Sequence, residues 1–280
     1  MEKVIFNGEI LERSEAVVDL EDRGYQFGDG VYEVIRVYDG KLFTGEEHVE
    51  RLFASAGKIK LEIPFSREEV LSLTRELIRE NGVKLGSVYM QVTRGTASRS
   101  HIFPDPSRTK GVFTAYSTEV PRPEKALENG VAAITADDIR WLRCDIKSLN
   151  LLPNVLAKQE AADQGCYEAI LHRSGTVTEG SSSNVYIVKD EKVITHPATN
   201  LILNGITRQV VLKLCAENNI LFAEEEYRVE ELLQADEIFI TSTTSEIMPV
   251  VKVDGIQVGD GKPGSVTRRL QALFQEEMSK

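Results

Sequence analysis

The segment spanning residues 140–150 contains the first side chain whose type and setting suggest chemistry. Lys147 lies there among apolar neighbours, namely Trp141, Leu142, Ile146, Leu149, Leu151 and Leu152. Burial disfavours the charged form of lysine, and the neutral amine is a nucleophile for carbonyl carbons. The alternative, and the commoner case for a single residue, is a lysine whose ammonium group reaches solvent along its alkyl chain. Lys147 is therefore a candidate nucleophile that needs support from other residues.

A second segment of this kind spans residues 176–185. Glu179 is followed there by Gly180, three serines at positions 181–183, and Asn184. Hydroxyl and backbone N–H groups in such a run could hold an anion, and the glutamate could hold a cation. A solvated loop is the alternative, since small polar residues are common in loops for conformational reasons.

Both segments belong to an ordered set of motifs that closely resembles the class IV, or fold-type IV, pyridoxal-phosphate aminotransferases. The matching stretches are residues 21–33, 145–150, 179–184, 205–208 and 241–246. Their order along the chain is more specific than any single motif, and the resemblance runs nearly from end to end. It implies an α+β fold of two domains, with pyridoxal 5′-phosphate bound between them.

The resemblance also implies roles for individual residues. Lys147 would form a Schiff base with the cofactor aldehyde and then move a proton between the substrate Cα and the cofactor C4′. Glu179 would keep the pyridine nitrogen protonated, so that the ring withdraws electrons, and Leu203 would pack against that ring. The phosphate would lie at the start of a helix after Gly205, where backbone N–H groups and the helix dipole favour an anion. Its implied ligands are Arg51, Ile206, Thr207 and Thr243.

The substrate site implied by the resemblance includes an Arg-x-His pair at Arg99 and His101, which is similar to the branch of the family that acts on D-amino acids. The pair and the hydroxyl of Tyr32 would bind the substrate carboxylate, for which the planar fork of arginine is suited. In that branch the arginine and histidine come from the partner subunit, which implies a homodimer. An exposed loop in which Arg99 and His101 contact only water is the alternative.

The serine run at residues 181–183 resembles the same branch. The implied reaction converts D-alanine and 2-oxoglutarate to pyruvate and D-glutamate, and the implied role is the supply of D-glutamate for peptidoglycan. Alternatives with the same fold are a branched-chain L-amino-acid aminotransferase, an (R)-amine transaminase and an aminodeoxychorismate lyase. A binding protein without catalysis is a further alternative, although such a protein has no reason to keep an amine at Lys147.

The elements that must position these residues can be predicted from turns and apolar periodicity. Hairpins are expected at Asp39-Gly40, Ser174-Gly175 and Asp190-Glu191, and a strand over residues 247–253 should run into Asp254-Gly255. Further strands are expected over residues 88–93, 111–116 and 131–135. Helices are expected after capping boxes formed by Thr44 with Glu47 and Ser66 with Glu69, over residues 155–164 up to Gly165, after Gly205, and over residues 266–274.

Prolines at positions 121 and 123 predict a linker over residues 121–124. The linker would separate an N-terminal α+β domain, residues 1–120, from a C-terminal α+β domain, residues 125–280, that carries Lys147. Hairpins and helices mix without a strict βαβ alternation, which favours α+β architecture over a doubly wound sheet.

Composition excludes several classes of function. The 280 residues include 33 Lys and Arg and 44 Asp and Glu, for a formal net charge of −11, which disfavours a nucleic-acid partner. No apolar run approaches the roughly 20 residues of a membrane helix, and the start does not resemble a signal peptide. Three widely spaced cysteines and four scattered histidines predict neither a disulfide framework nor a metal site. We expect a reduced, cytoplasmic protein without a membrane partner.

Overall fold

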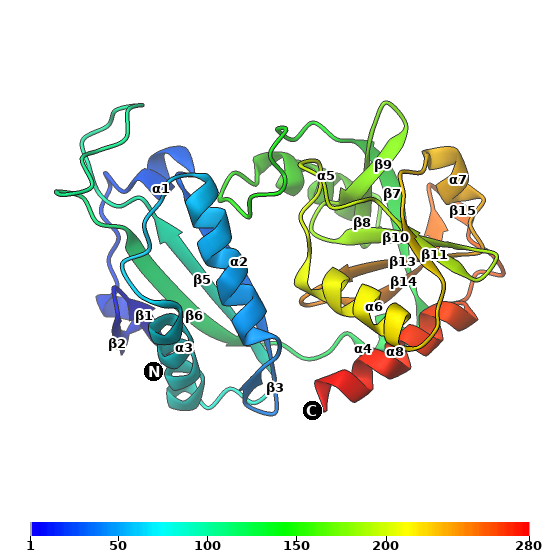
Figure 1. The fold of residues 1–280 in the computed structure, drawn as a ribbon, viewed down its shortest axis with the longest axis horizontal. Helices are drawn as coiled ribbons and strands as arrows, with labels where there is room; N and C mark the ends of the chain where they lie inside the picture. The colour runs from blue at the N-terminus through cyan, green and yellow to red at the C-terminus, as the bar shows by residue number, and fades with distance from the viewer. Residues whose placement is uncertain (1, 280) are drawn as a thin grey trace. The chain divides into compact units, whose positions relative to one another are not determined.

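The chain divides into two compact units in a computed structural model that describes residues 2–279 (Figure 1). The first unit comprises Met1–Pro121 and Ile146–Asn150, and the second comprises Arg122–Asp145 and Leu151–Lys280. Each unit combines helices with a sheet, so the α+β fold class is confirmed. The segment that carries Lys147 belongs to the first unit by its contacts, and its expected place in the C-terminal domain is therefore wrong.

The first unit is built on a sheet of six strands in the order β2-β1-β6-β5-β3-β4, in which every pairing is antiparallel. The central strands β3 and β5 stay in register from Gly30 opposite Thr93 to Val37 opposite Gly86. The strands of this sheet are β1 (Lys3–Phe6), β2 (Glu9–Glu12), β3 (Gly30–Tyr38), β4 (Lys41–Leu42), β5 (Gly86–Thr93) and β6 (Val112–Glu119).

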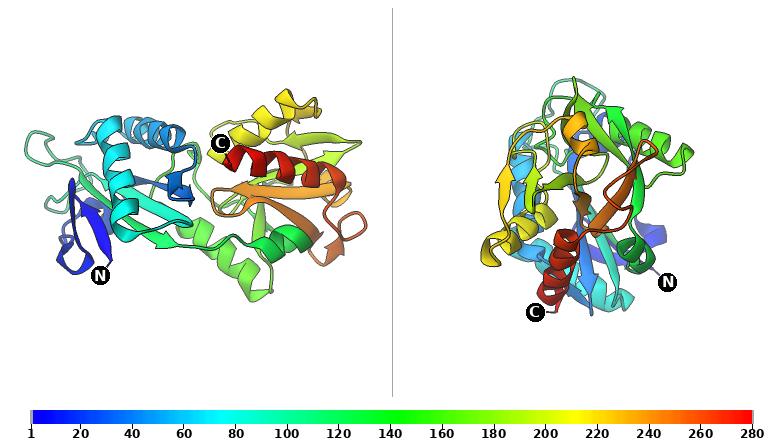
Figure 2. Two further views of the ribbon diagram at one scale, coloured as in Figure 1. Left: turned by 90° about the horizontal axis from the view of Figure 1, so that it is seen from below. Right: turned by 90° about the vertical axis from the view of Figure 1, so that its right-hand side faces the viewer.

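Two long helices cover one face of this sheet, as the views in Figures 1 and 2 agree. Leu52 and Leu77, one from each helix, pack with Ile35 and Met90 of the sheet in a core whose members are almost fully buried. Burial of each such side chain contributes about 1.5–3 kcal/mol. The helices of the first unit are α1 (Arg23–Phe27), α2 (Gly45–Lys58) and α3 (Arg67–Asn81), with a 3₁₀ turn at Arg13–Glu15.

The second unit is built on a mixed sheet of nine strands in the order β12-β11-β10-β13-β14-β7-β8-β9, with β15 paired to β14. β7 runs parallel to both of its neighbours, whereas β10, β13 and β14 form an antiparallel group. The strands are β7 (Val131–Asp137), β8 (Glu168–Arg173), β9 (Thr176–Gly180), β10 (Asn184–Lys189), β11 (Lys192–Thr195), β12 (Phe222–Glu224), β13 (Glu237–Ser242), β14 (Glu246–Val253) and β15 (Ile256–Gln257).

Helices lie against both faces of this second sheet. α5 packs through Ala157 and Ala161 onto Ile134 of β7, while the preceding residue in β7, Ala133, faces a separate core. This alternation is what successive side chains of a strand require. α6 and α8 contact each other and pack on β13 (Figure 1). The helices are α4 (Glu124–Asn129), α5 (Leu152–Asp163), α6 (Ile206–Glu217), α7 (Val229–Leu233) and α8 (Ser265–Met278).

The predicted hairpins are confirmed because their turn residues take the required conformation. Asp39 and Gly40 have φ of 48° and 73°, and Ser174 with Gly175 has φ of 49° and 86°. Positive φ at both central positions gives a turn whose twist matches that of the flanking strands. Asp190-Glu191 likewise joins β10 to β11, with φ of 48° and 62°.

The predicted helix starts have mixed outcomes. The capping box at Ser66 is confirmed, since Glu69 N–H donates to Ser66 Oγ at 3.2 Å and Ser66 N–H donates to Glu69 Oε2 at 2.7 Å. The one at Thr44 is wrong, because Thr44 has φ of 52° and its hydroxyl donates to the carbonyl of Phe43. α5 begins at Leu152 rather than 155, with Pro153 in its first turn, where the absent N–H costs nothing.

Candidate functional site

Lys147 is held in the first unit by backbone hydrogen bonds to the start of β3. Tyr32 N–H donates to Lys147 O at 3.0 Å, and Leu149 N–H donates to Gly30 O at 3.0 Å. The N–H of Lys147 itself donates to Ser55 Oγ on α2 at 3.2 Å. Residues 146–150 therefore lie antiparallel beside the start of β3 and form backbone hydrogen bonds with it. This pairing explains why the segment belongs to the first unit.

The side chain of Lys147 is half-buried and lies against an aromatic face. Its Nζ is 4.2 Å from the ring centroid of Tyr32, and that ring stacks on Tyr89 at 5.7 Å. The apolar surroundings expected from the sequence are largely wrong, because Trp141 and Leu142 are 45% and 62% exposed. The structure therefore brings the predicted nucleophile and Tyr32, one predicted substrate ligand, into direct contact.

Arg51 is fixed by a buried carboxylate on the same unit. Arg51 Nε and Nη2 donate to Glu33 Oε1 and Oε2 at 2.6 and 3.0 Å, and His48 Nδ1 lies 2.8 Å from Glu33 Oε2. Burial would raise the pKa of Glu33, but Arg51 and His48 outweigh burial and hold that pKa at about 2. Burial also lowers the pKa of His48. Glu33 is thus an anion at neutral pH that orients the Arg51 guanidinium.

Arg99 and His101 lie in an exposed loop on Phe27. The guanidinium carbon of Arg99 is 4.8 Å from the Phe27 ring centroid, and the His101 ring is 5.7 Å from it. Arg23 Nη1 donates to the carbonyl of Ser100 between them at 2.6 Å. Within the part of the chain that the structure describes, no hydrogen bond, ion pair or ring contact joins this pair to Tyr32.

Glu179 lies in the second unit at the end of β9, with its carboxylate buried. Arg140 Nη1 donates to Oε1, while Leu203 N–H and Asn184 Nδ2 donate to Oε2 at 3.0 and 3.1 Å. Burial raises the pKa of Glu179, and Arg140 opposes that rise. A carboxylate accepts about four hydrogen bonds, so these three donors leave Oε1 with capacity for one more.

Arg140 is itself held by a second buried carboxylate, Asp138. Arg140 Nε and Nη2 donate to Asp138 Oδ1 and Oδ2, both at 2.8 Å. Arg173 Nε and Thr178 Oγ1 also donate to Asp138 Oδ2 at 3.0 and 2.9 Å. Burial of Asp138 is outweighed by these donors, Arg140 first, which hold its pKa at about 2. A buried chain of alternating charges therefore ends at Glu179.

Two of the three hydroxyls in the serine run after Glu179 point to an internal carboxylate and not to an external anion. Ser181 Oγ and Ser183 Oγ both donate to the buried carboxylate of Glu168, the latter at 2.8 Å. Ser181 and Ser183 are nearly fully buried, so the solvated loop is also wrong for them. Glu168 instead shapes the turn between β9 and β10 from within.

Asn184 joins Glu179 to the start of α6. Besides donating to Glu179, its Nδ2 donates to Leu203 O at 2.9 Å. Its Oδ1 lies where a Cβ on Gly205 would be, so only glycine fits before α6. Ile206 and Thr207 open that helix, and the first N–H groups of a helix have no partner within it.

Thr243 lies at the same end of the second sheet. Asn184 pairs with Thr241 across β10 and β13, and Thr243 follows two residues later in the turn to β14. The structure therefore gathers the predicted cofactor residues of the second unit at one sheet end; they are Glu179, Leu203, Ile206, Thr207 and Thr243.

Several residues of this arrangement were missed from the sequence, namely Glu33, His48, Asp138, Arg140 and Glu168. Glu33 carried a usable signal, since it is a charged residue among the β-formers of residues 31–37. A charge in a buried strand requires a partner. The sequence does not indicate which residue is that partner, because Arg51 lies 18 positions after Glu33.

Two negative findings concern residues 2–279 only. No group of three or more His, Cys, Asp or Glu side chains in that range is placed to hold a metal ion. No helix in the same range has the length and apolar character needed to span a membrane.

Comparison with known proteins identifies the family. The model for class IV aminotransferases matches residues 30–253. The D-alanine aminotransferase of Listeria monocytogenes serotype 1/2a (strain 10403S) is 54% identical over 279 residues, which cover 99% of this chain and 96% of that protein. The D-alanine aminotransferase of Bacillus licheniformis is also 54% identical, over 99% of this chain and 97% of that protein.

Solved structures give the same family with lower identity. The branched-chain amino acid aminotransferase of Escherichia coli has a TM-score of 0.90 and 30% identity, covering 98% of this chain and 94% of that one. The branched-chain aminotransferase of the archaeon Thermoproteus uzoniensis, solved with norvaline, has a TM-score of 0.87 and 28% identity, covering 100% and 95%. This chain is therefore an enzyme that belongs to the class IV aminotransferase family.

Proposed function

We propose that this enzyme transfers the amino group of D-amino acids to 2-oxo acids with pyridoxal 5′-phosphate, converting D-alanine and 2-oxoglutarate to pyruvate and D-glutamate. The observation that carries the proposal is 54% identity, over nearly the whole chain, to D-alanine aminotransferases. Identity to the branched-chain enzymes is only 28–30%, although their folds are similar. Branched-chain L-amino-acid transamination is therefore the second candidate.

Each unit, taken by itself, offers groups that suit part of the cofactor. Pyridoxal phosphate, when bound, supplies an aldehyde that takes up the amino group and a ring that withdraws electrons from the bonds at the substrate Cα. Arg51, oriented by Glu33, and the N–H groups of Ile206 and Thr207 are donors suited to a phosphate. Thr243 adds a hydroxyl, and Leu203 would pack against the ring.

Glu179 suits a partner that carries a proton on a ring nitrogen. Three donors hold the carboxylate, and they leave one lone pair of Oε1 able to accept a further hydrogen bond. Arg140 pairs with this buried carboxylate and favours its charged form, and an anion in a low-dielectric place stabilises a nearby cation strongly. Glu179 therefore holds a proton at the pyridine nitrogen.

Lys147 is the base and acid at the substrate Cα. Its backbone is fixed by β3 and Ser55, and its amine lies over Tyr32, whose hydroxyl is assigned to the substrate carboxylate. A fixed backbone beneath a long, flexible side chain suits a group that would bond to the cofactor aldehyde and carry a proton at the substrate Cα.

We further propose a homodimer in which Arg99 and His101 act in the partner's site. Both are exposed and have no contact with Tyr32 among the described residues of their own chain. Ile102 and Leu20 of the same unit are 80% and 79% exposed, which is unusual for large apolar side chains and typical of a surface that is covered on assembly. Three free cysteines agree with a cytoplasmic location, where thiols stay reduced.

The first experiment is an absorption spectrum of the purified enzyme before and after D-alanine, and separately before and after L-alanine. We expect a yellow protein that is bleached by the D-isomer alone and that forms pyruvate when 2-oxoglutarate is added. Lys147→Ala should lose transamination by roughly a thousandfold or more, whereas Lys84→Ala, an exposed control, should retain it. Activity with L-leucine and none with D-alanine would establish the second candidate instead.

A further inference from the structure

The turn that carries Thr243 ends in a residue with an unfavourable backbone conformation. Residues 243–245 join β13 to β14, and Glu246, which pairs with Ser242 across the turn, has φ of 54°. This left-handed region is unfavourable for a residue that bears a side chain. Most other non-glycine residues with positive φ are Asn, Asp or Ser in turns, whereas Glu246 is a buried strand residue.

The side chain of Glu246 explains why glycine does not occupy this position. Arg122 Nε and Nη2 donate to Glu246 Oε1 and Oε2 at 2.8 and 2.7 Å, a bidentate pair. The Glu246 side chain is 4% exposed and that of Arg122 is 24% exposed, so the pair is poorly screened by water. A strained backbone persists where the surrounding contacts over-determine it, and here the ion pair does so.

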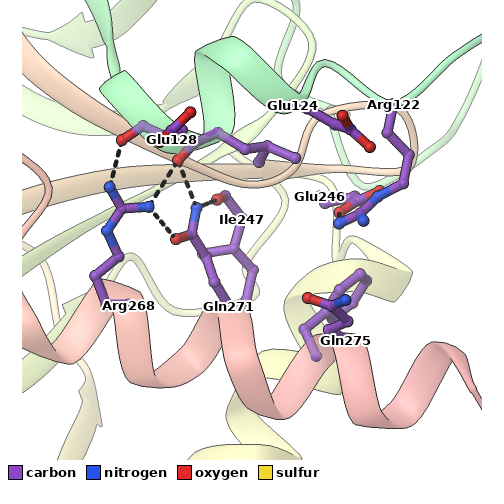
Figure 3. A pocket seen from close by; sticks show the side chains of 10 residues that line it. Arg122, Glu124, Glu128, Glu246, Ile247, Arg268, Gln271 and Gln275 are labelled. Carbon is purple, nitrogen blue, oxygen red and sulfur yellow. Dashed lines mark hydrogen bonds and ion pairs between the residues drawn. The ribbon is translucent and has the colours of Figure 1, made fainter.

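The pair lies in the wall of a cavity of about 230 Å³ between α4, α8 and the start of β14 (Figure 3). On the α8 side, Gln271 Nε2 donates to the carbonyl of Ile247 at 3.0 Å and to that of Leu127 at 3.0 Å. β14 is thus anchored immediately after Glu246. The open space beside the ion pair means that packing alone does not fix Glu246.

The turn itself is held by two further hydrogen bonds, both made by Ser245, the residue before Glu246. Ser245 N–H donates to Ser242 Oγ at 3.1 Å, and the hydroxyls of Ser245 and Tyr167 lie 2.8 Å apart. Thr243 is half-buried, and so it can present its hydroxyl to a ligand. Because Glu246 pairs with Ser242 across this short turn, its backbone conformation contributes to where the Thr243 hydroxyl lies.

We propose that Arg122 is a positioning residue for cofactor binding: through Glu246 it holds the 243–245 turn in the conformation that presents Thr243 to the cofactor phosphate. The inference rests on the proposed function, which assigns Thr243 to that phosphate. Arg122 does not touch the phosphate itself. Without the ion pair, Glu246 relaxes toward negative φ, and the turn moves with it.

The test compares two ligands that differ only in the phosphate. The apoenzyme is titrated with pyridoxal 5′-phosphate and with pyridoxal, and binding is followed by absorbance. Arg122→Met should weaken binding of pyridoxal phosphate by about tenfold, the scale of one hydrogen bond to a charged group. It should leave pyridoxal binding unchanged within about twofold. Arg75→Met, which breaks an exposed ion pair with Glu46 in the first unit, is the matched control and should change neither.

A second variant separates positioning from general destabilisation. Glycine adopts positive φ without cost, so Glu246→Gly combined with Arg122→Met should recover part of the phosphate-dependent affinity that Arg122→Met loses. Circular dichroism checks that each variant is folded.

Equal losses for the two ligands, or no loss for either, would overturn the positioning role of Arg122. Failure of the double variant to bind pyridoxal phosphate better than Arg122→Met would overturn the role of the Glu246 conformation. A wild-type protein that binds the two ligands equally would instead overturn the phosphate site of the proposed function, and the present inference with it.

Discussion

Replacing Glu33 by glutamine is expected to remove about 3 kcal/mol of the free energy of unfolding at neutral pH. The Glu33 carboxylate is fully buried, and Arg51 and His48 outweigh the effect of that burial to lower its pKa from 4.5 to about 2. At 1.36 kcal/mol per pH unit, this difference between folded and unfolded states corresponds to about 3 kcal/mol. Because the folded-state pKa is the lower one, the stabilisation is complete above pH 4.5. It is lost as the pH falls toward 2.

The assay is urea unfolding followed by circular dichroism at pH 7, 5, 4 and 3, for wild type and Glu33→Gln. The difference in unfolding free energy should be about 3 kcal/mol at pH 7 and 5 and should shrink below pH 4.5, since glutamine cannot take up the proton. Glu80→Gln, which removes a surface partner of Lys3, is the control and should have a much smaller effect. A difference that stays constant from pH 7 to 3, or that is below about 1 kcal/mol throughout, would refute the assignment of stability to this carboxylate.

Three further predictions concern the candidate site and the cysteines. Arg99→Ala should raise KM for D-alanine by roughly 10- to 100-fold, as expected for a lost charge-assisted hydrogen bond, while affinity for pyridoxal phosphate stays unchanged; equal loss of the cofactor would contradict its role. Glu179→Lys should lower kcat by about 100-fold or more while the bound cofactor remains visible by absorbance, because a cation opposes protonation of the ring; near-normal kcat would assign Glu179 another role. At pH 8, iodoacetamide should modify the half-buried Cys166 before Cys144 and Cys215, because burial raises the pKa of both to about 11; peptide mass spectrometry that finds Cys144 labelled first would contradict this order.

The sequence predicted correctly those hairpins and helix caps that depend only on residues close together in the chain. Asp39-Gly40 determines its turn by itself, because both residues tolerate positive φ. Ser66 and Glu69 satisfy each other's backbone donors within one helical turn. Thr44 has the same spacing to Glu47 but follows the short strand β4 almost directly and has φ of 52°, with its hydroxyl donating to the carbonyl of Phe43. Residue spacing alone therefore does not determine a capping box, because the preceding connection also decides the backbone conformation of the first residue.

The position of Lys147 could not be predicted from composition or periodicity. Its segment is held by hydrogen bonds to β3 and Ser55, which lie about a hundred residues earlier in the chain. The apolar residues beside it in sequence suggested burial, yet Trp141 and Leu142 are exposed and the lysine contacts Tyr32 instead. Lys147 became a candidate through its family motif, which is associated with a function whatever the fold around it. The pairing of its segment with β3 involves distant residues and leaves no local signal in the sequence.

The charged candidates share a physical arrangement that explains why buried carboxylates recur in this chain. Arg51 is oriented by Glu33, and Glu179 is oriented by Arg140, which Asp138 holds in turn. A charged side chain that binds a ligand group must hold one orientation. Fixing a flexible side chain in one rotamer costs conformational entropy. A buried partner of opposite charge fixes that direction during folding, so no reorganisation is needed when the ligand binds.

The same argument predicts an effect of Asp138→Asn, which leaves Arg140 in place but weakens its support. Because Arg140 then holds Glu179 less firmly, kcat should fall by about tenfold, the scale of one weakened hydrogen bond between charged groups. Asp145→Asn is the matched control, since it makes the same change in the ion pair of the exposed Arg143, and it should leave kcat within about twofold. Steady-state kinetics with saturating pyridoxal phosphate measures both. Equal kcat values for the two variants would mean that Glu179 keeps its direction without Asp138, and that the buried chain of charges serves stability alone.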